Sequence, residues 1–176
     1  MQGENTRSCG TCTACCDGWL RIEVHGHQVS PGKPCPFRVQ HGCSIYDERP
    51  QHPCREFICG WLVASSPLPD WMRPDKSDLI MLAANFVWRG LPVDVVVAAG
   101  ERPKKKALDW LMKFGTERRR CLIYQISDEW FAFGPPAFRP RFPPGSPGVR
   151  NHGRTDLGQS SRGLAKMHSA VHNQEL

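Results

Sequence analysis

The stretch CGTCTACC, residues 9–16, opens a segment, residues 8–62, around which we expect the fold to be organised. Eight of the nine cysteines fall in this segment. They are Cys9, Cys12, Cys15, Cys16, Cys35, Cys43, Cys54 and Cys59. Each CxxC step places two sulfurs on one tight turn with backbone amides directed at them, which favours Zn–S or Fe–S bonding. The spacing therefore predicts that this segment folds around a metal.

The compartment expected for the protein supports the metal over disulfide bonds. Residues 1–7 have no apolar core of the kind that a signal peptide requires, and no apolar run is long enough to span a bilayer. We therefore expect a cytoplasmic protein, whose thiols are kept reduced. The odd cysteine count also disfavours a disulfide framework. Cysteines that act only as small buried hydrophobic residues are the other alternative, and Cys121, alone at the start of an apolar strand, fits that description.

The sequence leaves the identity of the metal open. Eight thiolates suffice for two tetrahedral zinc sites, or for one four-cysteine iron–sulfur cluster with the remaining thiols on a second ion. Adjacent side chains point apart in extended backbone, so Cys15 and Cys16 serve different metals or one of them lies outside the ligand set. His52 is the first substitute if one cysteine is not a ligand. Arg49 and Arg55 either neutralise the thiolates or are ordinary exposed arginines.

The order of these motifs resembles a known family. CxxCxxCC, CPF, GCSIYxxRP, CRxFxC and GWL follow one another as in the cysteine-cluster (CxxCxxCC) family, which is described as a zinc- or iron-chelating domain. The resemblance covers about the first third of the chain and is far more specific than a lone CxxC. It implies a metal site formed by the eight cysteines and brings no established reaction with it. The residues that carry it are Cys9, Cys12, Cys15, Cys16, Cys35, Pro36, Gly42, Cys43, Ile45, Tyr46, Arg49, Pro50, Cys54, Arg55, Phe57 and Cys59.

The part of the chain that follows predicts a small α+β layer. Residues 92–99, PVDVVVAA, are a strand rich in β-branched side chains. Residues 103–115 begin with proline, end with glycine and carry apolar side chains at helical spacing, so we predict a helix. Residues 121–126 and 130–133 are two further strands, whereas 79–82 fits either a strand or a helix start.

The predicted fold class is α+β, in three parts. Residues 1–65 are a loop-rich, metal-nucleated segment that contains a short strand at 19–24 and a helical turn at 54–59. Residues 66–134 are a small, mainly antiparallel sheet with one helix, in the same globular unit. Residues 135–176 are rich in proline and arginine and are predicted to be a disordered tail.

Charge gives little support to a nucleic-acid face on the folded part. The chain of 176 residues carries a net charge of +6, and the six basic and two acidic residues of 134–176 account for +4 of it. Two basic triplets, residues 104–106 and 118–120, flank the predicted helix and fit either phosphate contacts or solvated helix ends.

The predicted function is chelation of zinc or iron, or of an iron–sulfur cluster, through the eight cysteines, and the cellular role is left open. The alternatives are an iron–sulfur redox or enzyme-associated protein and a zinc-stabilised nucleic-acid binder. The sequence has no GxSxG, Walker, dinucleotide or HExxH motif, so it identifies no catalytic residue and does not decide whether the protein is an enzyme. The expected partner is a metal ion, without a membrane.

Overall fold

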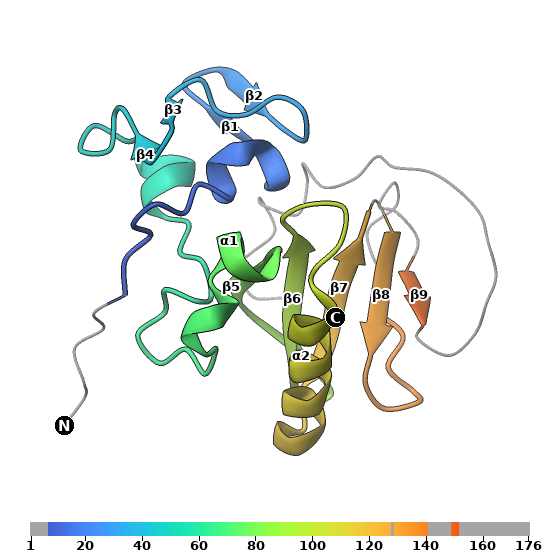
Figure 1. Ribbon diagram of the computed structural model, residues 1–176. Helices are drawn as coiled ribbons and strands as arrows, with labels where there is room; N and C mark the ends of the chain where they lie inside the picture. Colours follow the sequence, from blue (N-terminus) through green and yellow to red (C-terminus); the bar gives the residue numbers. More distant parts are fainter. Residues whose placement is uncertain (1–6, 128, 141–148, 152–176) are drawn as a thin grey trace.

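The computed structural model describes residues 7–127, 129–140 and 149–151 (Figure 1). A five-stranded sheet has the order β5-β6-β7-β8-β9, and the cysteine-rich segment lies at the end of this sheet where β6 and β7 finish (Figure 1). The pairs β5–β6 and β7–β8 are antiparallel, whereas β6–β7 and β8–β9 are parallel. The α+β class is confirmed, and the sheet is mixed.

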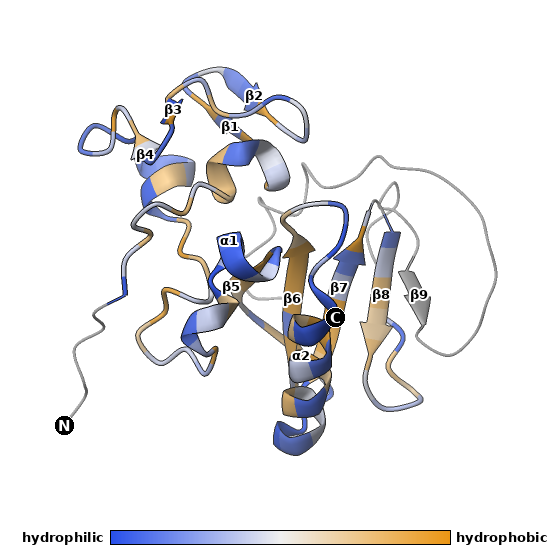
Figure 2. Cartoon of the chain, viewed as in Figure 1, coloured by the Kyte–Doolittle hydropathy of each residue, from blue (hydrophilic) through white to orange (hydrophobic). Residues whose placement is uncertain are grey.

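The two central strands follow directly from their side chains. β6 (Leu91–Ala98) and β7 (Cys121–Ile126) are mostly apolar on both faces, as buried parallel strands are, with Asp94 the charged exception on β6 (Figure 2). A parallel pair needs a crossover, which α2 (Lys105–Arg118) supplies while it packs over β7. Both strands were predicted, and the helix extends three residues beyond Gly115. Gln125 is the polar exception on β7, with only 7 % of its surface exposed.

The outer strands complete the sheet. The ambiguous run at 79–82 begins β5 (Leu79–Trp88), and the predicted strand at 130–133 is β8 (Glu129–Phe133). β9 (Val149–Asn151) pairs with β8. Phe138 is almost fully buried and packs edge-on against Trp88, with ring centroids 5.2 Å apart. The folded unit therefore extends past residue 134, and the rest of the predicted tail, 141–148 and 152–176, lies outside the described residues.

The cysteine-rich segment consists of short elements joined by turns. Its helical turns are η1 (Cys15–Trp19) and η2 (Gln51–Arg55), and its hairpins are β1 (Ile22–Val24) with β2 (His27–Val29) and β3 (Arg38–Val39) with β4 (Gly42–Cys43). The strand predicted at 19–24 is shorter in the structure, where it begins at Ile22, because Trp19 belongs to η1. The predicted turn at 54–59 lies earlier, over η2. Two further short helices, η3 (Asp70–Met72) and α1 (Pro74–Ser77), lead into β5.

One hydrophobic core joins the cysteine-rich segment to the sheet. Leu20 and Trp61 belong to the same buried cluster as Ile80 and Tyr124. Backbone pairing also crosses the junction, because Cys59 forms an isolated antiparallel β-bridge with Leu82 of β5. The predicted parts 1–65 and 66–134 therefore share a core.

Arg7 fastens the start of the described chain to the loop after Cys59. Its guanidinium donates hydrogen bonds to the carbonyls of Trp61 (3.0 Å) and Leu68 (2.8 Å) and lies over the Trp61 ring. It also pairs with Asp70 at 2.9 Å. Within the described part of the chain, no helix is long and apolar enough to cross a membrane.

Gly18 is a position that the fold of the cysteine-rich segment requires to be glycine. Its φ of 97° lies in the left-handed region, and a Cβ there would overlap the backbone carbonyl of Ser30. The close approach places η1 against the turn that follows β2. Gly26, by contrast, has a φ of 78° but open space around it.

We expect Gly18→Ala to lower the free energy of unfolding by more than about 3 kcal/mol, because backbone strain and overlap act together. Gly26→Ala is the matched control, with a loss of about 1 kcal/mol from the positive φ alone. Urea denaturation of the two variants measures the difference. Equal losses would contradict the close approach of η1 to Ser30.

Candidate metal centre

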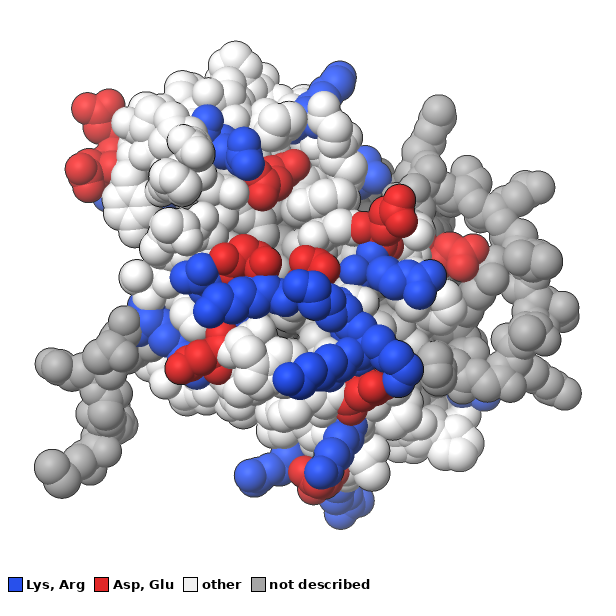
Figure 3. All heavy atoms as spheres, in the orientation of Figure 1, with Lys and Arg blue, Asp and Glu red and all other residues white. Residues whose placement is uncertain are grey.

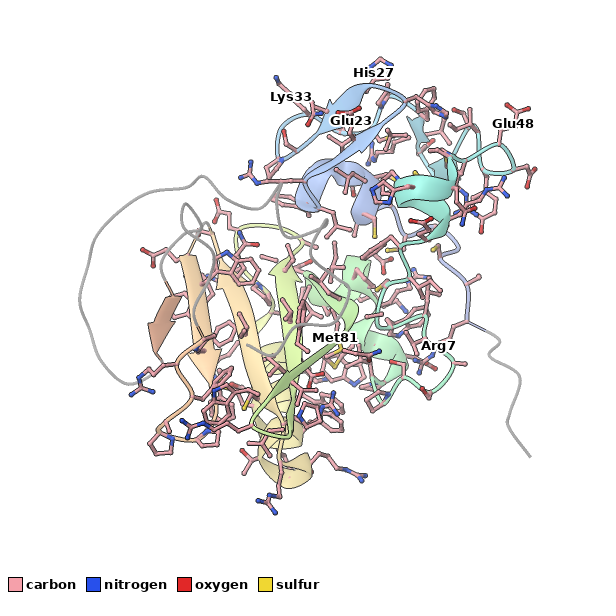
Figure 4. All side chains as sticks on the ribbon, turned by 180° about the vertical axis from the view of Figure 1, so that it is seen from behind. Arg7, Glu23, His27, Lys33, Glu48 and Met81 are labelled. Carbon is pink, nitrogen blue, oxygen red and sulfur yellow. The ribbon has the colours of Figure 1, made fainter. Side chains whose placement is uncertain are left out.

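All eight predicted cysteines line one cavity of about 460 Å³ within the cysteine-rich segment and at its junction with the sheet. The cavity wall comes from η1, η2, both hairpins, the chain around Cys59 and the residues before α1, so cysteines up to fifty positions apart meet there. All nine cysteines are free thiols, and Cys121 lies away from this cavity, fully buried in β7. Figure 4 shows sulfur atoms at the junction, near the labelled Met81.

Cys9, Cys12, Cys15 and Cys59 form the first set of neighbouring thiols. The pKa of Cys15 is raised well above its ordinary value, first by burial and then by the thiols of Cys59, Cys16, Cys12 and Cys9. The pKa of Cys59 is raised to about 11, chiefly by burial, with Cys12 and Cys9 adding to the rise. Apart from Cys16, its neighbour in the chain, Cys15 therefore interacts with thiols of one group.

Cys16, Cys35, Cys43 and Cys54 form the second set. Burial is the largest cause of the rise in the pKa of Cys16, to about 12, and Cys35, Cys43 and Cys54 follow in that order. The pKa of Cys54 is also raised by burial and then by Cys35 and Cys43. The adjacent cysteines at the start of η1 thus have different thiol neighbours.

Local backbone hydrogen bonds produce this division. The Cys12 N–H donates to the Cys9 carbonyl (2.9 Å) and closes the CxxC turn of the first set. The Cys35 N–H donates to the Cys16 carbonyl (2.8 Å), which brings the loop after the first hairpin to η1. Cys59 reaches the first set because its strand bridge to Leu82 anchors it beside β5. The position of Cys59 in the first set therefore depends on its pairing with β5 and could not be read from the spacing of the cysteines.

Two arginines at the cavity wall oppose the negative charge that thiolates would carry. Desolvation and Cys12 raise the pKa of Cys9, and Arg49 and Arg73 offset part of that rise. Arg49 acts on Cys54 in the same direction. Arg55, the other predicted neutralising residue, is not part of the cavity wall and donates from Nε to the Arg49 carbonyl at 2.8 Å.

Arg73 is the wall residue that the sequence did not reveal. It lies beyond the linker-like residues 64–70, directly before α1, and no cysteine spacing points to it. Its guanidinium is held by Asp75 through two hydrogen bonds of 2.6 Å. This pair fixes a cation beside the first set of thiols.

Of the histidines His41 and His52, one lies in the cavity wall and the other lies on the surface. His41 lines the cavity, whereas His52, the predicted substitute ligand, is not part of the wall. The Nδ1 atom of His52 lies 3.0 Å from the Glu56 carboxylate on an exposed face. His41 is therefore better placed than His52 to replace a cysteine.

The donor atoms fit a thiophilic metal, although they do not close on a point. Among the described residues, no group of three or more His, Cys, Asp or Glu side chains is arranged to hold a metal ion directly. The eight thiols instead surround a shared space. Thiolates are the ligands that zinc and iron–sulfur clusters prefer, and a bound cation reverses the mutual repulsion that raises the pKa values of these thiols.

The surface charge of the sheet unit is compensated locally in part. Figure 3 shows a band of Lys and Arg side chains over α1 and the start of α2. Within it Lys104 lies 3.7 Å from Asp78, and Lys105 lies 2.7 Å from Asp109. In the second basic triplet, Arg120 makes a two-pronged ion pair with Asp94 at 2.7 Å. These pairings weaken the phosphate-binding interpretation of both triplets.

The raised pKa values predict slow thiol chemistry in metal-free protein. Alkylation requires the thiolate, so a pKa raised by burial lowers the reactive fraction at neutral pH. In chelator-treated protein we expect the iodoacetamide reaction at Cys59 and Cys16 to reach half of its maximal rate near pH 11 and about 12, respectively. Mass spectrometry of peptides after short pulses of reagent at each pH measures this.

A free cysteine peptide in the same tube is the control and should reach half-maximal reactivity near pH 8.5, at about the ordinary value. Circular dichroism confirms that the treated protein is still folded. If the two thiols of the folded protein had the same midpoint pH as the peptide, burial and neighbouring thiols would not raise their pKa values.

Comparisons with known proteins add no information on function, so the functional proposal depends on the geometry of the site. No protein-family model matches the chain, and no curated protein and no solved structure is found to be similar to it.

Proposed function

We propose that this is a metal-binding protein in which eight cysteines chelate zinc or iron in two four-cysteine centres. The observation that supports the proposal most strongly is the meeting of all eight thiols at one cavity. The first centre uses Cys9, Cys12, Cys15 and Cys59, and the second uses Cys16, Cys35, Cys43 and Cys54. This division follows the neighbours that raise the pKa values of Cys15 and Cys16.

Bound metal would supply cross-links within a segment that is built of short elements. The first centre would join the N-terminal turn to Cys59, which already bridges β5. The second would join η1 to β4 and η2. Because such a site does not exist in the unfolded chain, its binding free energy becomes folding free energy. Arg49 and Arg73 would reduce the negative charge that four thiolates leave around a divalent ion.

An iron–sulfur protein is the second candidate function, and the size of the cavity favours it. A tetrahedral zinc site needs four sulfurs about 2.3 Å from one ion, which leaves almost no free space. The eight thiols here surround about 460 Å³ without converging on a point. An open arrangement of this kind has room for a cluster of several iron atoms, which would supply electron transfer.

Purification without oxygen from cells replete in zinc and iron tests the proposal and separates its two forms. We expect about eight cysteines to bind about two zinc ions, or iron with inorganic sulfide, measured by elemental analysis beside an absorption spectrum. Zinc gives a colourless protein, whereas an iron–sulfur cluster gives a brown protein that air or dithionite bleaches. Protein that carries neither metal contradicts the proposal.

Single substitutions test the division into two centres. Cys12→Ser and Cys59→Ser should each remove the same half of the bound metal, and Cys35→Ser and Cys54→Ser the other half, because each variant opens one centre. Metal content per protein, with melting temperature, is the measurement. Cys121→Ala is the matched control, since its thiol is buried in β7 away from the cavity, and it should keep the full metal content.

The pairings among these variants decide the result. If Cys59→Ser removes the metal that Cys35→Ser removes, the division is wrong even though the protein binds metal. If all four variants keep their metal, the cysteines are not the ligands.

A further inference from the structure

A second cavity, of about 420 Å³, lies between the cysteine-rich segment and the sheet, separate from the thiols. Trp19, Arg21 and Pro31 form one wall, and Glu101, Gln125 and Ser127 belong to the other. The second wall lies just beyond the carboxyl ends of β6 and β7, the parallel pair joined by α2. The carboxyl ends of parallel strands are a recurrent place for small-molecule binding.

Gln125 is the observation that points to a ligand. It is 7 % exposed and lines the cavity, and within the described residues its side chain makes no hydrogen bond. Ser77, the other buried polar residue in the described part of the chain, donates its hydroxyl hydrogen to the Met72 carbonyl at 3.0 Å. A buried amide without a partner is costly, because it loses its hydrogen bonds to water and gains none in return.

The backbone around Gln125 holds this wall in an unusual conformation. Ser127 has a φ of 53°, in the left-handed region that serine rarely adopts. Its N–H donates to the Glu101 carbonyl, which joins the end of β7 to the turn after β6. Strained backbone of this kind persists where surrounding structure fixes it, and it gathers at binding sites.

The charges of the lining define the chemistry of the ligand. A cationic residue, Arg21 of the cysteine-rich segment, and an anionic residue, Glu101 of the sheet unit, both line it. Gln125 adds an amide that both donates and accepts. A cation, an anion and a neutral amide around one small cavity complement a zwitterion that also carries hydrogen-bonding groups.

We infer that this cavity binds a free α-amino acid. Its carboxylate meets Arg21, its ammonium group meets Glu101, and its polar atoms satisfy the amide of Gln125. The cavity is large enough for any of the common amino acids, and the exposed position of Glu101 gives the ligand a path from solvent. The inference stands independently of the proposed metal centres, because no cysteine lines this cavity.

Binding of the twenty common L-amino acids to the full chain tests the inference, with nucleosides and monosaccharides as comparison compounds. Saturation-transfer NMR and thermal shift are the readouts. We expect at least one amino acid to bind with a dissociation constant of about 1 mM or below and to raise the melting temperature. Glu101→Gln should weaken that binding about tenfold, because the ammonium group loses its counter-charge.

Two further variants separate ligand binding from a structural role of Gln125. Gln125→Met keeps the side-chain volume but removes the amide, so binding should weaken about tenfold while the unliganded protein melts at or above the wild-type temperature. Gln28→Met and Glu48→Gln, both at exposed sites in the cysteine-rich segment, are the matched controls and should bind as the wild type does (Figure 4 shows Glu48).

Three results would overturn the inference. The first is that no amino acid binds, and the second is that a nucleoside or sugar binds in its place. The third is that Gln125→Met and Glu101→Gln bind the amino acid as tightly as the controls do.

Discussion

The gathering of eight thiols around one cavity is the constraint on which the rest of the structure depends. Desolvation and mutual proximity raise the pKa values of several of them, most clearly those of Cys15, Cys16 and Cys59. In the metal-free state these sulfurs are kept neutral, and the segment around them has few regular elements to hold it together. Its two hairpins and two helical turns are too short to be stable alone. Metal bound at this cavity, as we propose, would therefore stabilise this half of the molecule.

The sheet supplies what the cysteine-rich segment lacks. β6 and β7 are buried on both faces and share one core with Leu20 and Trp61, so the segment packs on a preformed surface. Cys59 belongs to both parts, since it lines the cavity and bridges β5. Arg73 joins them in a second way, because it stands beside the thiols and leads into α1. The candidate site is thus assembled from the local CxxCxxCC motif, four more distant cysteines and two arginines.

The sequence predicted the parts whose physics is local. The β-branched run at 92–99 and the helix over 103–115 could be read directly, although the helix continues to Arg118, and cysteine spacing identified the eight cysteines that line the first cavity. The pairing of the strands could not be predicted, because nothing in residues 121–126 indicates that they lie parallel to β6. The same limit hid Arg73 and the role of Gln125, whose importance comes from tertiary burial. Phe138 was assigned to a disordered tail because its neighbours are rich in proline, although its own ring packs against Trp88.

η1 is five residues long and borders both cavities. It begins with Cys15 and Cys16 at the thiols and ends with Trp19 at the wall of the second cavity. Only Asp17 and Gly18 separate Cys16 from Trp19, so the two cavities are joined through a very short span of backbone. Thermodynamic linkage then requires reciprocity: whatever metal does to the affinity of the second cavity, the occupant of that cavity does to the affinity for metal. With metal and an amino acid bound as proposed, the short span from Cys16 to Trp19 would be the route by which the two sites influence each other.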